Sequence, residues 1–167
     1  MPNSGLISSL DTIEKFLAHK RLAMVGLSRD PKDFSVMLYR ELCKRGYVVV
    51  PVNPNAAEVQ GQHSYGRVGE IEPPVEAVLL MTSAEVTEKV VEECAQAGIQ
   101  WVWMYGPGSA AKISEKAVAF CKEHGMEVIA GECPFMFFQK NGWHRVHGWL
   151  QKMAGKYPKR MASDRVQ

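Results

Sequence analysis

Hydroxyl and basic side chains follow directly after an apolar run near the start of the chain. The run at residues 22–25 is followed by Gly26, Ser28, Arg29, Lys32 and Ser35. Hydroxyls and cations are the side chains that contact phosphate oxygens, and a helix beginning near Ser35 would leave amides free to meet an anion. The spacing therefore predicts a site for a ligand that carries phosphate.

Candidate groups also follow three later strands of the same kind. Asn53 and Pro54 come after a strand near 47–52, Thr82 comes after one near 76–81, and Met104 ends one at 101–104. Ligands of open α/β sheets bind beyond the carboxyl ends of the strands. We therefore expect these loops to meet the first loop at one edge of the sheet.

A dinucleotide site would show Gly-x-Gly-x-x-Gly in the first loop and an acidic residue at the end of the second strand. The chain has neither, because only Gly26 stands in the first loop and Asn53 takes the acidic position. An NAD(P)-dependent oxidoreductase, or another nucleotide-binding enzyme, stays as the alternative function.

Cys133 is the remaining candidate for chemistry, because a fifth strand near 126–130 would carry it to the same edge. A reactive thiol needs exposure and a lowered pKa, so a buried, structural thiol is the preferred interpretation. His144 and His147 are spaced for one helix face and could bind zinc with a thiolate, but a docked apolar helix explains the same residues without any ion and is the interpretation we favour. We predict no metal and no catalytic residue.

The pattern of helices and strands predicts an α/β fold. Three amphipathic runs end in a glycine that leads into an apolar strand, at Gly46, Gly98 and Gly125. The helix that follows the strand near 76–81 is expected to start with a capping box at Thr82–Glu85. A spacing of about 25 residues between strands leaves room for crossover helices, so the sheet should be parallel. We predict a doubly wound three-layer sandwich with strand order 3-2-1-4-5 and an added C-terminal helix.

Length and composition limit the class of protein. The 167 residues suit one domain at 20–140, with an N-terminal helix within 1–19 and a C-terminal helix and basic tail at 141–167. A net charge of +2 is too small to indicate a nucleic-acid partner. The four cysteines lack zinc spacing, and no leader or membrane span is recognisable, so we expect reduced thiols, no membrane association and a cytoplasmic location.

Several strings in this chain occur together in one known family. They are Val25-Gly-Leu-Ser-Arg-Asp-Pro31 with Ser35, Gly46-Tyr-x-Val-x-Pro-Val-Asn-Pro54, Gly61-x-x-x-Tyr65, Val102-Trp-Met104 and Cys133-Pro134. Over about residues 20–135 the chain resembles the stand-alone CoA-binding domains related to the nucleotide-binding domain of succinyl-CoA synthetase. The chain departs from the commoner family pattern after the third and fourth strands, at Thr82–Ser83 and Tyr105–Gly108, and again at Gly131–Glu132 before Cys133.

The resemblance implies a Rossmann-like domain that binds coenzyme A or an acyl-CoA without catalysing a reaction. It places Gly26, Ser28 and Arg29 on the phosphate side, and Asn53 and Pro54 on the adenosine side. The expected cofactor-binding residues are Gly26, Leu27, Ser28, Arg29, Lys32, Ser35, Val36, Asn53, Pro54, Thr82 and Met104, with Cys133 as a thiol contact.

A role as an interaction subunit is a third interpretation. It would use the aromatic C-terminal helix and the pair Trp101 and Trp103 as a surface for a homodimer or an unidentified protein partner. Alternating tryptophans on a central strand more often fill the two sides of a sheet, so we favour a core position for this pair.

Overall fold

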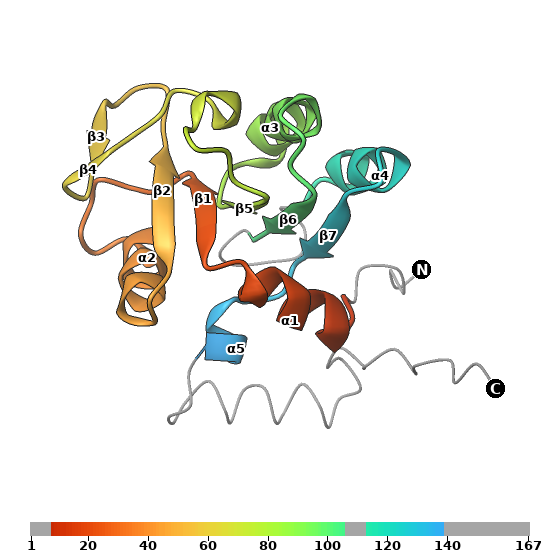
Figure 1. Cartoon of the computed structure of the whole chain (residues 1–167), viewed down its shortest axis with the longest axis horizontal. Coiled ribbons are helices and arrows are strands. Elements are labelled where there is room, and N and C mark those ends of the chain that lie inside the picture. Colours follow the sequence, from red (N-terminus) through yellow and green to blue (C-terminus); the bar gives the residue numbers. More distant parts are fainter. Residues whose placement is uncertain (1–7, 106–112, 139–167) are drawn as a thin grey trace.

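The computed structural model describes residues 8–105 and 113–138 (Figure 1). The predicted C-terminal helix and the His144–His147 pair lie outside these ranges. Five parallel strands form one sheet in the order β2-β1-β5-β6-β7. Their bounds are β1 Arg21–Val25, β2 Val48–Val52, β5 Ala77–Leu80, β6 Trp101–Met104 and β7 Glu127–Ala130. The predicted α/β class, the parallel sheet and its five strands are thereby confirmed.

The predicted strand order is wrong. The third strand of the sheet, β5, pairs with β1 rather than with β2, so the order is 2-1-3-4-5 instead of 3-2-1-4-5. Pro51 gives the physical reason, because it lacks the amide hydrogen that a strand with neighbours on both sides would use. At this edge the Pro51 carbonyl accepts the Tyr65 amide at 3.1 Å, and Val52 forms an isolated bridge with Tyr65.

Helices cover both faces of the sheet, as Figure 1 shows. On one face lie α1 (Leu10–Ala18), α2 (Phe34–Lys44) and the short α5 (Phe135–Phe138), and on the other lie α3 (Ala84–Gln96) and α4 (Glu115–Glu123). Side chains of β1 alternate between the two layers: Leu22 and Met24 pack with α1 and α2, while Ala23 and Val25 pack with α3 and α4. Near-continuous apolar strands are what burial on both faces requires.

The glycines predicted to end helices have the conformation that this position needs. Gly46, Gly98 and Gly125 have φ values of 80°, 74° and 68°, which favour glycine because it has no Cβ. The predicted capping box at the start of α3 is wrong. Ser83 is the N-cap but makes no side-chain bond to the helix, while the Thr82 hydroxyl pairs with that of Thr87 at 2.8 Å.

A small hairpin that the sequence did not reveal follows β2. It consists of β3 (Glu58–Val59) and β4 (Gln62–His63), and its turn residues Gln60 and Gly61 have φ values of 53° and 73°. Val59 is buried with the residues under α2, which fixes the hairpin to that side of the domain. The chain then passes through Tyr65 and the short helix η1 (Val68–Glu70) to β5.

Trp103 and Trp101 do not form a joint surface. Trp103 is completely buried and meets the Phe16 ring edge-on at 5.2 Å, whereas Trp101 is half-buried beside His19.

In residues 8–105 and 113–138, none of the helices has the length and apolar character needed to cross a membrane.

Gly26, at the end of β1, is held against the loop that follows β5. Its φ is 90°, and a Cβ on Gly26 would lie 2.4 Å from the Met81 carbonyl oxygen. The backbones of the two loops therefore touch at the point where the order of the sheet reverses. Only a residue without a side chain permits this approach.

Replacing Gly26 with alanine should lower the free energy of unfolding by about 2 kcal/mol or more, because backbone strain and a backbone clash add. Gly46→Ala is the matched control, since its φ is also positive but nothing lies within 4 Å of its Cβ position. It should cost about 1 kcal/mol. Urea denaturation of both variants measures the difference, and equal losses would contradict the backbone contact.

Candidate functional site

The loop between β1 and α2 is closed by a chain of hydrogen bonds. The Ser28 amide donates to Ser35 Oγ at 3.0 Å, while the Ser35 amide and hydroxyl donate to Asp33 Oδ1 at 2.8 and 2.5 Å. Asp33 is the N-cap of α2. The expectation that amides at this helix start are free is therefore wrong for Ser28 and Ser35, because neighbouring side chains already accept from them.

Two further side chains order the outer part of this loop. Ser28 Oγ accepts the Asp30 amide at 3.0 Å, and Asp30 Oδ1 accepts the Lys32 amide at 2.9 Å. Such turns shape a loop through its own polar side chains. Within the described part of the chain, the amides of Arg29 and Phe34 make no hydrogen bond. These two amides are donors that this loop still offers to a ligand.

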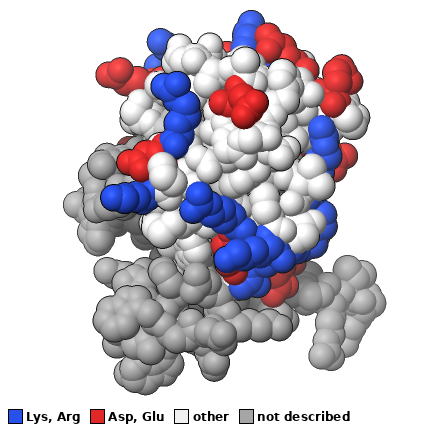
Figure 2. Space-filling view, turned by 90° about the vertical axis from the view of Figure 1, so that its left-hand side faces the viewer, with Lys and Arg blue, Asp and Glu red and all other residues white. Residues whose placement is uncertain are grey.

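Basic side chains gather on the face that carries α2. Figure 2 shows Lys and Arg side chains across the lower part of this face, with acidic side chains among them. The exposed basic residues of the loop and helix are Arg29, Lys32, Arg40, Lys44 and Arg45. Arg29 and Lys32 stand in the predicted phosphate loop itself, so a ligand phosphate there would meet two cations.

The predicted adenosine loop lies beside the phosphate loop. Val52, which precedes it, pairs with Val25 of β1. The Asn53 side-chain oxygen accepts the Asn55 amide at 2.9 Å, and the following Pro54 is exposed. The β3–β4 turn is fastened to the phosphate loop, because the Gln60 side-chain amide donates to the Ser28 carbonyl at 3.2 Å. Gln60 is a contact of the predicted phosphate loop that sequence reasoning missed.

The structure separates the remaining candidates into contacts near the first loop and core residues. Thr82 lies next to Gly26, since its Cγ2 atom would be 3.0 Å from a Cβ placed there. By contrast, the side chains of Leu27, Val36 and Met104 are at most 1% exposed and belong to the two cores. These three side chains therefore serve packing and offer no surface to a ligand.

Cys133 lies at the same sheet edge but beyond β6 and β7. It is half-buried, and its thiol lies beside the Tyr105 side chain. Burial and the neighbouring thiol raise the pKa of the Tyr105 phenol well above its ordinary value. The Phe34 ring at the start of α2 lies 5.5 Å from that of Tyr105. This contact connects the phosphate loop to the thiol along the edge.

Glu132 stands between β7 and Cys133 and is buried. Its carbonyl accepts the Trp103 indole N–H at 2.9 Å, which anchors this turn to the core. Burial raises the pKa of the Glu132 carboxyl to about 7, because a low-dielectric environment disfavours its charged form. Sequence reasoning noted this residue only as a departure from the family pattern, since nothing in a single sequence marks an acid as buried.

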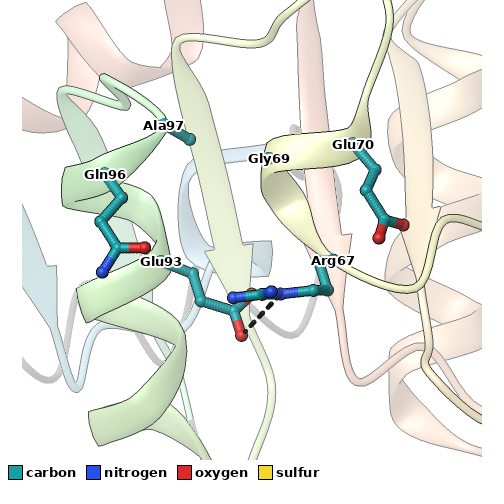
Figure 3. A pocket seen from close by; sticks show the side chains of 6 residues that line it. All are labelled: Arg67, Gly69, Glu70, Glu93, Gln96 and Ala97. Carbon is teal, nitrogen blue, oxygen red and sulfur yellow. Dashed lines mark ion pairs between the residues drawn. The ribbon is translucent and has the colours of Figure 1, made fainter.

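Two cavities lie along the last turns of α3, away from all these loops. One, of about 300 Å³, is bounded by Arg67, Gly69, Glu70, Glu93, Gln96 and Ala97. In Figure 3 the Arg67 and Glu93 side chains point toward one another across it and form an ion pair of 3.3 Å. The other, of about 420 Å³, lies between α3 and α4. Neither includes a residue that the sequence predicts as a ligand contact.

Replacing Glu132 with glutamine should make stability less dependent on pH. The folded pKa of about 7 exceeds the ordinary 4.5, so the folded state binds the proton more tightly. The contribution of Glu132 to the free energy of unfolding is therefore most favourable below pH 4.5, where the carboxyl is protonated. This contribution is lost as the pH rises through 7. Glu132→Gln should exceed the wild type by about 2 kcal/mol at pH 8, with no advantage at pH 4.5.

Chemical denaturation at the two pH values measures this difference. Glu127→Gln is the control, because Glu127 is exposed at the start of β7, the strand that precedes Glu132. Parallel pH profiles of wild type and Glu132→Gln would contradict a buried, protonated carboxyl.

Comparisons with known proteins find relatives over most of the described residues. The uncharacterized protein YneT of Bacillus subtilis is 31% identical over 114 residues, covering 68% of this chain and 82% of that protein. The alpha subunit of the ADP-forming acetate–CoA ligase II of Pyrococcus furiosus is 28% identical over 128 residues. That match covers 72% of this chain but only 28% of the ligase subunit.

A solved structure and a family model extend these matches. A hypothetical protein from Pyrococcus horikoshii superimposes with a TM-score of 0.69 at 29% identity, covering 80% of this chain and 91% of that one. The model described as the CoA binding domain matches residues 20–139, which include every loop described above. The chain is thus a member of the CoA-binding domain family.

Proposed function

We propose that this chain binds coenzyme A or an acyl-CoA at the carboxyl ends of β1, β2 and β5. The observation that carries the proposal is the phosphate loop within the matched family region, with its exposed Arg29 and Lys32 and the free amides of Arg29 and Phe34. Coenzyme A carries a diphosphate and a ribose phosphate. Cations and amides are the groups that recognise such anions.

The neighbouring loops suit the other parts of the ligand. The Asn53–Pro54 turn, which follows β2 beside the phosphate loop, would supply the adenosine side. The pantetheine arm would run past Phe34 and Tyr105, so that its thiol ends near Cys133. In this arrangement the ligand follows the sheet edge on which the parallel strands end.

The proposal assigns binding alone to this chain. In the described part of the chain, none of the hydroxyls of Ser28 and Ser35 or the thiol of Cys133 is hydrogen bonded to a histidine that could act as a base. The chain spans only 28% of the ligase subunit that it resembles. Any acyl transfer would therefore need a protein partner that supplies the remaining machinery.

Isothermal titration of the full chain with coenzyme A tests the proposal directly. We expect saturable binding by the wild type, and Arg29→Glu should weaken it about tenfold at low salt because it reverses a charge beside the phosphates. Arg40→Glu is the matched control, since Arg40 is exposed on α2 outside the loop. No binding of coenzyme A, or tighter binding of NAD(P), would overturn the proposal.

Alkylation of cysteines tests where the thiol end of the ligand lies. Saturating coenzyme A should slow the reaction of Cys133 with iodoacetamide by about fivefold or more, because a bound ligand limits access to a half-buried thiol. Cys43, exposed on α2, should react at the same rate with and without ligand. Peptide mass spectrometry follows both sites, and an unchanged rate at Cys133 would exclude it as a ligand contact.

A further inference from the structure

The Asp33 carboxylate holds the donors that a phosphate would need at the start of α2. Its Oδ1 atom accepts both the amide and the hydroxyl of Ser35, at 2.8 and 2.5 Å. Ser35 Oγ in turn accepts the Ser28 amide at 3.0 Å. Three donors of the phosphate loop are thus satisfied by a chain of acceptors that ends in one negative charge.

The charges of the loop do not outweigh this carboxylate. Arg29 and Lys32 supply two positive charges, and Asp30 and Asp33 supply two negative ones, so the loop is neutral. Within the described residues none of these four side chains forms an ion pair. An incoming phosphate therefore meets a like charge that already occupies the positive end of the helix dipole.

We propose that Asp33 is an internal competitor for the ligand's phosphate. Binding displaces the carboxylate from Ser35, and a phosphate oxygen then accepts the Ser35 amide and hydroxyl in its place. This inference rests on the proposed function and adds a selection step to it. A phosphate brings more negative charge and more acceptor oxygens than a carboxylate, so it can replace Asp33. Phosphate-free pantetheine has no anionic group that could do so.

A purely structural role for Asp33 makes a different prediction. Asparagine caps a helix about as well as aspartate does, because its side-chain oxygen accepts the same amide. Asp33→Asn therefore keeps the cap and removes the charge. If Asp33 only caps α2, this variant should bind coenzyme A no more tightly than the wild type.

The test compares Asp33→Asn with Asp30→Asn by isothermal titration with coenzyme A at low salt. Both variants remove one negative charge from the same loop, but among the described residues the Asp30 side chain accepts only the Lys32 amide and forms no hydrogen bond with Ser35. We expect Asp33→Asn to bind about fivefold more tightly than the wild type, and Asp30→Asn to change affinity by less than about twofold. Thermal unfolding of both variants checks that α2 stays folded.

The affinities of the wild type and the two variants decide whether Asp33 competes with the ligand's phosphate. Equal gains in both variants would show general charge repulsion and overturn the competition, and so would an unchanged or weaker affinity of Asp33→Asn. If the wild type binds and Asp33→Asn gains nothing, the proposed function stands and only this inference falls. If Asp33→Asn binds while the wild type does not, the proposed function of the wild type falls, and this inference, which rests on it, falls with it. If neither binds coenzyme A, both proposals are overturned.

Discussion

The contact between Gly26 and the Met81 carbonyl is the constraint on which the site depends. It lies where the chain order of the sheet reverses, between β1 and β5, and it forces the loops after these strands together. Because β1 pairs with β2 on its other side, the Asn53 loop emerges next to the same point. One close backbone approach thus gathers three loops at one edge, and a side chain at Gly26 would separate them.

Polar side chains then give the phosphate loop a definite shape before any ligand arrives. The side chains of Ser28, Asp30, Asp33 and Ser35 accept backbone amides of the loop, and Gln60 fastens the loop to the β3–β4 hairpin. A preformed loop loses little conformational entropy on binding. The same hydrogen bonds occupy the donors that a phosphate would use. The bonds that order the loop therefore leave fewer donors free for a ligand at the start of α2.

The far end of the edge has a different character. There the groups are a half-buried thiol, a phenol with a raised pKa and the buried Glu132, all held by the core around Trp103. The Phe34 ring connects this apolar end to the charged loop. An elongated ligand with phosphates at one end and a thiol at the other matches this change along the edge. This match is the physical basis of the proposed function.

Local chemistry in the sequence determined most of the elements. Helix-ending glycines such as Gly46, together with continuous apolar strands, predicted the five parallel strands and the helices between them, because these signals act over a few residues. The loops that carry Ser28 and Asn53 followed from the same reasoning. Pro51 also held the information that β2 lies at an edge, although the predicted strand order did not use it.

Tertiary structure alone decided which strands are neighbours and which polar groups are already occupied. Hydrogen bonds such as that from Gln60 to Ser28 join residues 32 positions apart, and burial of Glu132 depends on elements far from it in the chain. Position in the sequence predicted three residues as ligand contacts whose side chains are buried in the core, namely Leu27, Val36 and Met104. Pairing, burial and competition for donors depend on the whole packed chain, so no local pattern of residues specifies them.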